Sequence, residues 1–223
     1  MKFEDLGVSP EIVKALHDQG ITEPTEIQHK TIALILQGKD VIGISKTGSG
    51  KTAAFGVPIL DIIEHGKGVQ SLIMAPTREL AVQICSELRK FAKNKRFSIV
   101  PIYGGVSLDP QIHQMRTADI VVGTPGRLKD HLQRNTIDLS KVKIVVLDEA
   151  DKMVEMGFIE DVETIIQHMP VRKQVLLFGA TISLEVEHIE KRYMHNPATV
   201  QAESYVQEEY LKQEYYNVKQ HEK

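Results

Sequence analysis

A glycine-rich segment between a hydrophobic run and a helix-like stretch has the composition of a phosphate-binding loop. It follows Val41–Ile44 and reads Ser45-Lys46-Thr47-Gly48-Ser49-Gly50-Lys51-Thr52. Glycines let successive backbone N–H groups turn toward one phosphate, and the amino end of a helix adds partial positive charge. Lys51 could then reach the outer phosphates of a nucleotide, and the Thr52 hydroxyl could bind Mg²⁺. Ser45 stands where the strict pattern has glycine, and the alternative is a glycine-rich turn without a ligand.

A second candidate is the acidic pair that ends the hydrophobic run Ile144–Leu147. Asp148 could hold Mg²⁺ directly or through water, and Glu149 could orient or deprotonate an attacking water molecule. A metal and a positioned water are what triphosphate hydrolysis requires. The alternative is that both acids only cap the helix that follows. We therefore predict Lys51, Asp148 and Glu149 as catalytic residues, with Thr52 and Asp148 as the Mg²⁺ ligands.

These segments need a scaffold that brings the ends of several strands together. Short β-branched runs recur at Val41–Ile44, Ser71–Ala75, Ser98–Ile102, Asp119–Val122, Ile144–Leu147 and Gln174–Phe178. Several are continuously apolar, which is typical of strands buried on both faces. Helix-like stretches such as Thr52–Glu64, Glu79–Ala92 and Phe158–His168 lie between them. The sequence therefore predicts an α/β fold, a mainly parallel sheet flanked by helices on both faces, with ligands beyond the carboxyl ends of the strands.

Composition limits the possible partners and location. The net charge is −3, so contact with nucleic acid would be local and would not involve a broad basic face. The only cysteine is Cys85, which excludes an internal disulfide. No apolar run approaches the ~20 residues of a membrane span, and the sequence starts without the apolar core of a secretion signal. We expect a cytoplasmic monomer that does not contact a membrane.

The residues Asp148-Glu149-Ala150-Asp151 spell the signature of the DEAD-box ATP-dependent RNA helicases, and other motifs of that family's first RecA-like (P-loop NTPase) lobe appear in family order. The stretch Gly20–Gln28 resembles the Q motif, with Phe3 as its isolated upstream aromatic. The phosphate loop matches as well. Three RNA-contacting motifs are resembled by Pro76-Thr77-Arg78-Glu79-Leu80, by Gly104-Gly105 and by Thr124-Pro125-Gly126-Arg127. Phe178-Gly179-Ala180-Thr181 occupies the place of the family's Ser-Ala-Thr motif. The resemblance covers residues 1–205.

The resemblance implies ATP and Mg²⁺ as cofactors and RNA as a partner. It assigns nucleotide binding to Phe3, Ile21, Gln28 and the phosphate loop. The Gln28 amide is suited to the adenine edge, whereas Ile21 replaces a frequently aromatic residue. It assigns RNA phosphate and ribose contacts, which do not read bases, to Pro76, Thr77, Arg78, Gly104, Gly105, Thr124, Pro125, Gly126 and Arg127.

Two departures qualify this interpretation. Gly179 stands where the family has serine, so the set Asp151, Gly179, Ala180 and Thr181, which should couple ATP hydrolysis to strand separation, is expected to couple weakly. The resemblance also implies a second RecA-like lobe that supplies catalytic arginines. We expect residues 206–223 to be a linker that leads to it through a strand at Glu214–Val218, and this lobe alone to be nearly inactive.

Three alternatives remain at this point. The parent protein could be an ATP-gated RNA clamp or assembly platform that does not unwind RNA processively. The chain could be a generic phosphate-loop ATPase or kinase without RNA, although ATP chemistry does not need the three RNA-contacting motifs. It could also be a catalytically dead fragment.

Overall fold

A seven-stranded, entirely parallel sheet forms the centre of the protein in the computed structural model, which describes residues 2–202. Its order is β3-β4-β2-β5-β6-β1-β7. The strands are β1 Val41–Ile44, β2 Ser71–Met74, β3 Ile99–Ile102, β4 Ile120–Gly123, β5 Ile144–Leu147, β6 Gln174–Gly179 and β7 Ala198–Gln201. The predicted α/β class and six of these strands are confirmed, whereas β7 was not predicted. The expected linker and the strand at Glu214–Val218 lie outside the described residues.

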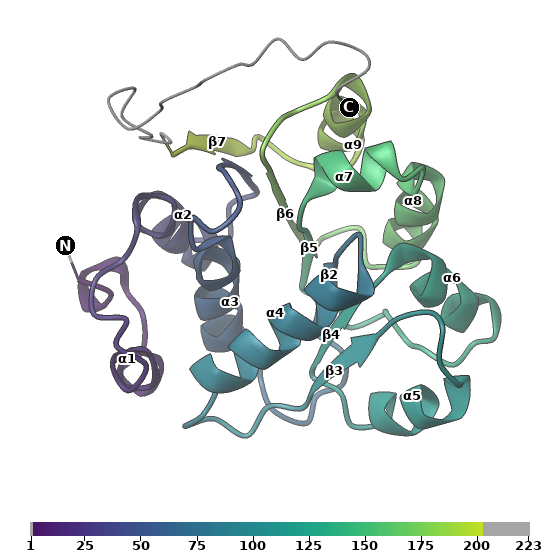
Figure 1. Cartoon of the computed structure of the whole chain (residues 1–223), viewed down its shortest axis with the longest axis horizontal. Helices are drawn as coiled ribbons and strands as arrows, with labels where there is room; N and C mark the ends of the chain where they lie inside the picture. The colour runs from purple at the N-terminus through teal and green to yellow at the C-terminus, as the bar shows by residue number, and fades with distance from the viewer. Residues whose placement is uncertain (1, 203–223) are drawn as a thin grey trace, which may run out of the picture.

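Helices cover both faces of the sheet (Figure 1). On one face lie η1, a short 3₁₀ helix, and α1 to α4; on the other lie α5 to α9. Their bounds are η1 Glu4–Leu6, α1 Pro10–His17, α2 Glu26–Leu36, α3 Lys51–Ile62, α4 Arg78–Phe91, α5 Leu108–Met115, α6 Pro125–Gln133, α7 Ala150–Glu155, α8 Ile159–Gln167 and α9 Leu184–Tyr193. No helix among residues 2–202 is both long and apolar enough to cross a membrane.

The apolar runs are continuous because each of the six predicted strands supplies side chains to two hydrophobic cores. In β5, Ile144 and Val146 pack into the core beneath α1 to α4, whereas Val145 and Leu147 pack into the core beneath α7 to α9. Successive side chains of a strand point to opposite faces, so burial on both faces requires apolar residues at every position. Because all strand pairs are parallel, the carboxyl ends of the strands lie along one edge of the sheet.

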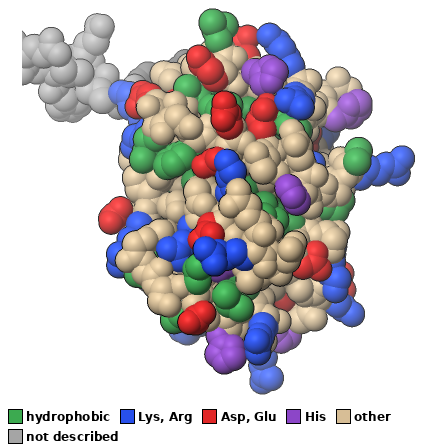
Figure 2. Space-filling model, turned by 90° about the vertical axis from the view of Figure 1, so that its right-hand side faces the viewer, with side chains coloured by type: hydrophobic (Ala, Val, Ile, Leu, Met, Phe, Trp, Pro, Cys, Tyr) green, Lys and Arg blue, Asp and Glu red, His purple; other side chains and the backbone are tan. Residues whose placement is uncertain are grey.

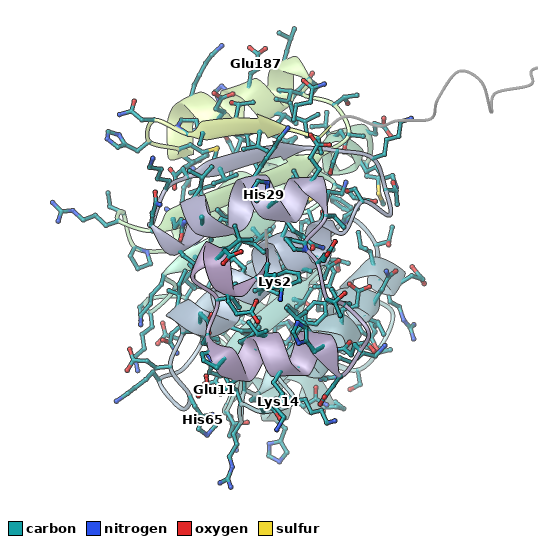
Figure 3. All side chains as sticks on the ribbon, turned by 90° about the vertical axis from the view of Figure 1, so that its left-hand side faces the viewer. Lys2, Glu11, Lys14, His29, His65 and Glu187 are labelled. Atoms are coloured by element: carbon teal, nitrogen blue, oxygen red, sulfur yellow. The ribbon has the colours of Figure 1, made fainter. Side chains whose placement is uncertain are left out.

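The amino-terminal segment packs over α3 and α4. Figure 3 looks onto this side, where Glu11 and Lys14 of α1 and His29 of α2 lie at the surface. Phe3 is fully buried in the core that this segment completes. The structure thus gives Phe3 a packing role, and its predicted contact with a nucleotide stays a prediction.

Candidate functional site

The phosphate loop turns between β1 and α3, as predicted. Gly48 and Gly50 have φ angles of 82° and 91°, in the left-handed region that favours glycine. The Lys51 ammonium donates to the Ser45 carbonyl at 3.1 Å and is largely buried beneath the loop. An ammonium has three donors, so Lys51 can keep this bond and still donate to a phosphate. The Ser45 and Ser49 hydroxyls lie 2.8 Å apart and close the loop.

The predicted adenine-reading residue is joined directly to the phosphate loop. The Gln28 side-chain oxygen accepts from the Thr25 N–H at 3.0 Å, and its Nε2 donates to the Gly50 carbonyl at 3.0 Å. A Cβ at position 50 would lie 2.4 Å from Gln28 Nε2, so only glycine allows this approach. Gln28 is 3% exposed, and one acceptor position and one N–H of its amide have no partner among these bonds. Contact between Gln28 and adenine therefore stays a prediction, as does that of the partly buried Ile21.

Asp148 lies at the end of β5, where its backbone N–H donates to the Met74 carbonyl of the neighbouring β2. Burial raises the pKa of its carboxyl to about 7; the charge of Lys51 opposes this rise and that of Glu149 adds to it. A buried carboxylate with so raised a pKa is one that a cation would stabilise. No cluster of three metal-binding side chains occurs among residues 2–202. The buried Asp148 carboxyl fits a nearby cation, so a contact between Asp148 and Mg²⁺ stays a prediction.

Glu149 has a left-handed backbone conformation, with φ of 55° and ψ of 50°. Non-glycine residues in this region store strain, and such residues cluster at functional sites. Its carboxylate pairs with the Lys152 ammonium at 2.9 Å. The sharp turn brings Glu149 to the same sheet edge as Asp148, but its predicted action on water requires an oxygen that Lys152 does not occupy.

Asp151 connects the acidic motif to the end of β6. Its Oδ2 accepts from the backbone N–H groups of Ala180 and Thr181, both at 3.0 Å, and from the Thr181 hydroxyl at 3.3 Å. Gly179 adds no side chain to this contact, although a Cβ there would lie 3.3 Å from Asp151 Oδ1. The structure thus brings together all four predicted coupling residues, mainly through backbone donors.

The three predicted RNA motifs meet at the ends of the neighbouring strands β2, β4 and β3. The Thr77 hydroxyl caps α4 by accepting from the Leu80 N–H at 3.2 Å. Arg78 is exposed, with its guanidinium 4.7 Å from the centre of the Tyr103 ring. An added Cβ at Gly104 or Gly105 would meet nothing within 4 Å, so the backbone there is open to a ligand. This edge presents both a cation and bare backbone.

Arg127 differs from Arg78 because its side chain is only 12% exposed. Its guanidinium donates to the Val106 carbonyl at 2.9 Å and to Gln111 Oε1 at 3.3 Å. Gln111 in turn contacts His131. Gln111 and His131 are supporting residues that the sequence analysis missed. The available signal was a polar residue on the buried face of a helix: Gln111 and Met115 are buried one turn apart in α5, and Leu128 and His131 in α6.

The distribution of surface charge agrees with the expectation that any contact with nucleic acid is local and does not use a broad basic face. Figure 2 shows the side formed by α5, α6 and α8, where acidic and basic side chains are interspersed. A hollow of about 1120 Å³ lies at the opposite edge of the sheet, beside the residues that precede β1, β5 and β6, including Lys39, Lys143 and Lys173. It is remote from the phosphate loop and from the predicted RNA motifs, so we do not assign it to either.

The chain is similar in sequence to known proteins. Residues 25–189 match the family model described as DEAD/DEAH box helicase. Two curated relatives are the DEAD-box ATP-dependent RNA helicase CshA of Geobacillus kaustophilus, 48% identical over 91% of this chain, and the ATP-dependent RNA helicase CshA of Listeria monocytogenes, 45% identical over the whole chain. The chain spans 44% and 43% of their respective lengths.

Solved structures agree in fold as well as in sequence. A DEAD box protein from Methanococcus jannaschii superposes with a TM-score of 0.89 at 42% identity, covering 91% of this chain and 56% of that one. A protein from Sulfolobus tokodaii titled as a hypothetical ATP-dependent RNA helicase gives 0.81 at 44% identity, covering 86% and 56%. Together with the family match and the motif geometry, these similarities show that the chain belongs to the DEAD/DEAH box helicase family.

Proposed function

We propose that this chain is the first RecA-like lobe of an ATP-dependent RNA helicase and binds Mg²⁺–ATP and the backbone of single-stranded RNA. The observation that carries the proposal is the Asp151 contact with Ala180 and Thr181, which joins the acidic motif to the end of β6. That end also bonds the phosphate loop, because the Ser45 N–H donates to the Gly179 carbonyl at 3.0 Å. The predicted ATP and coupling residues therefore form one connected unit.

Each residue in the nucleotide site has a distinct role in this proposal. Lys51 and the loop N–H groups bind the phosphates, and Thr52 and Asp148 hold Mg²⁺. The bound metal would neutralise charge that develops on the transferred phosphoryl group. Glu149 orients the attacking water once its carboxylate is released from Lys152. Gln28 selects adenine through the acceptor and donor that its bonds to Thr25 and Gly50 leave available.

The proposal includes a second lobe, to which residues 206–223 lead from the lobe at 1–205. Arginines from such a lobe would supply about 10³–10⁵ of the hydrolysis rate, by analogy with related phosphoryl transfers. The isolated chain should therefore bind nucleotide but hardly turn it over. Monomeric action in the cytoplasm is also part of the proposal.

Titration of the chain with a fluorescent ATP analogue and Mg²⁺, and separately with single-stranded RNA at low salt, tests this function. We expect saturable binding of both ligands, competition by ATP but not by GTP, and almost no RNA-stimulated hydrolysis. Binding of nucleotide with no RNA binding would favour a generic ATPase. Robust RNA-stimulated hydrolysis by the chain alone would contradict the need for a second lobe.

One observation favours a second function, an ATP-gated RNA clamp. Gly179 leaves the contact with Asp151 to backbone N–H groups and Thr181, without the serine hydroxyl of the family pattern. Weak coupling would allow RNA to be held without being unwound. A duplex-unwinding assay on the protein with its second lobe distinguishes the two: a clamp would retain RNA in the presence of ATP but leave the duplex intact.

A further inference from the structure

A hydrogen-bonded network of buried polar side chains, here called the polar network, lies between α5 and α6, close to the exposed glycine pair. Gln111 is 5% exposed and His131 is 0% exposed. Gln111 Oε1 lies 3.1 Å from His131 Nε2, and His131 Nδ1 lies 2.8 Å from the Thr136 hydroxyl. Burying polar groups is unfavourable unless they are hydrogen-bonded, so these side chains are restricted to orientations that satisfy all of them.

The partners of Gln111 and His131 fix which atoms donate and which accept in the polar network. Gln111 Nε2 donates to the Tyr103 carbonyl at 3.0 Å, so the acceptor Oε1 faces His131 Nε2 and the Arg127 guanidinium. His131 must therefore donate from Nε2. Burial lowers the pKa of His131, and the charge of Arg127 lowers it further. A neutral imidazole has a single N–H, which leaves Nδ1 as an acceptor. The Thr136 hydroxyl lies 2.8 Å from Nδ1 and 3.1 Å from the His131 carbonyl, so its one proton is offered to these two acceptors.

The polar network holds both ends of the Gly104–Gly105 loop. Tyr103 precedes the glycines and is bonded through its carbonyl to Gln111. Val106 follows them and is bonded through its carbonyl to Arg127, which Gln111 also contacts. Glycines have no side chains that could anchor the loop, and no atom lies within 4 Å of where a Cβ would be at either position. The conformation of the loop therefore depends on its two ends.

The polar network is also connected to the exposed Arg78 of the neighbouring motif. The Arg78 guanidinium lies over the Tyr103 ring at 4.7 Å, which is the range of a cation–π contact. Since Gln111 fixes the Tyr103 backbone, it also restricts the platform on which Arg78 rests. Gln111 is thus connected to all three predicted RNA motifs, directly to that of Arg127 and through Tyr103 to the other two.

We propose that Gln111 and His131 are positioning residues for RNA, which hold the Gly104–Gly105 loop, Arg127 and the Tyr103 platform of Arg78 ready for the phosphates of a single strand. The inference rests on the proposed function, because it requires RNA to bind at this edge. Neither residue needs to touch the RNA. The physical reason is preorganisation: a loop that is already held in its bound geometry loses less conformational freedom on binding.

The first test measures the affinity of the whole chain for single-stranded RNA at several salt concentrations, and for an ATP analogue. Gln111→Leu and His131→Leu remove the hydrogen bonds but keep an apolar volume. Gln70→Leu is a matched control, because Gln70 is 1% exposed and bonds Glu64 near the amino end of β2, remote from the RNA motifs. His131→Gln should restore function, since its amide can donate from the place of Nε2.

For Gln111→Leu and His131→Leu, we expect RNA affinity to fall about tenfold with a shallower salt dependence, as when phosphate contacts are lost. ATP-analogue affinity should change less than about twofold. Gln70→Leu should leave RNA affinity unchanged, and His131→Gln should recover most of it. Equal RNA affinity in wild type, Gln111→Leu and His131→Leu would overturn the positioning role alone. An equal loss in Gln70→Leu would also overturn it, by assigning the effect to general destabilisation.

A second measurement does not depend on RNA or on the folding of a variant. Nitrogen-15 NMR of the wild-type imidazoles at pH 7 should show His131 neutral, with its proton on Nε2. A proton on Nδ1, or a charged ring, would overturn the assignment of donors and acceptors in the polar network and with it the proposal. Absence of RNA binding by a folded wild-type chain with the expected His131 tautomer would instead contradict the proposed function, and the inference would fall with it.

Discussion

The two halves of the carboxyl edge are held in place by different kinds of residue. We call the ends of β1, β5 and β6 the nucleotide half, and the ends of β2, β3 and β4 the RNA half. In the nucleotide half the predicted residues bond one another: Gln28 bonds Gly50, and Asp151 bonds Thr181. In the RNA half, Arg127 depends on Gln111, which belongs to no recognised motif. A motif can therefore mark a site without containing what shapes it.

The largest expected effect breaks the nucleotide half. Lys51→Ala should reduce the affinity for an Mg²⁺–ATP analogue about 100-fold, because it removes a buried, charge-assisted donor to the phosphates. RNA affinity should hardly change if the halves are independently built. Fluorescence titration measures both, with the exposed Lys14→Ala as the control. A parallel loss of RNA affinity in a folded variant would show that the two halves are not separable.

The next effect breaks the RNA half. Arg78→Ala should weaken binding of single-stranded RNA about tenfold and reduce the slope of log affinity against log salt by about one, because one phosphate contact is lost. Nucleotide affinity should be unchanged. Arg116→Ala provides the control, since Arg116 is exposed on the same side of the sheet but outside the motifs. An unaltered salt slope would mean that Arg78 does not contact phosphate.

A smaller effect concerns stability and sharpens the picture of the nucleotide half. Burial raises the pKa of Asp148 from 3.8 to about 7, so between these values the folded chain binds more protons than the unfolded chain. Its contribution to stability is fully present below pH 3.8 and is lost as pH rises through 7. Asp148→Asn should therefore have a free energy of unfolding higher than that of wild type by on the order of 1–3 kcal/mol above pH 7 and by much less near pH 4, and should unfold at a correspondingly higher temperature.

Thermal unfolding in EDTA measures this difference, because Mg²⁺ would itself favour ionised Asp148. Asp138→Asn is a control of opposite sign. Hydrogen bonds from Ser140 lower the pKa of the exposed Asp138, so its charge stabilises the folded chain above pH 3.8 and this contribution is lost as the pH falls below that value. A pH-independent difference between wild type and Asp148→Asn would contradict the proposed burial cost.

The smallest effect tests the junction at Asp151. Gly179→Ser should change nucleotide and RNA affinity less than about twofold, because the backbone N–H groups already bond Asp151. In the protein with its second lobe, the added hydroxyl should raise the unwinding rate about two- to threefold, in line with one modest hydrogen bond. Lys14→Ser, at an exposed position of α1, controls for a serine introduced elsewhere. Equal unwinding rates would remove Gly179 as the cause of weak coupling.

Sequence was a good guide where neighbouring residues set the structure. The apolar runs predicted six strands to within a residue or two, because both faces of the sheet are buried. It missed β7, since Thr199 and Gln201 are exposed at the sheet edge and Val200 is the one buried residue of this strand. An edge strand covered on one side has a weaker apolar pattern.

Sites were predictable in location but less so in contacts. The phosphate loop and the acidic motif follow strands that the sequence identified, so their meeting at one edge was expected. The burial of Phe3 in the core could not be predicted, because it depends on how the amino-terminal segment packs over α3 and α4. Gln111 was missed because one amide on a helix gives no local sign of its partners at Tyr103, Arg127 and His131.

Pro101 gives the outer edge of the sheet a further property. It lies in β3, and the carbonyls of Ser98, just before β3, and of Ile102 accept from the N–H groups of Ile120 and Thr124, so the backbone nitrogen of residue 101 faces away from the sheet. Proline has no N–H there, and a strand from another molecule would lack one of the bonds it needs. At this edge the fold therefore discourages strand-to-strand aggregation between chains.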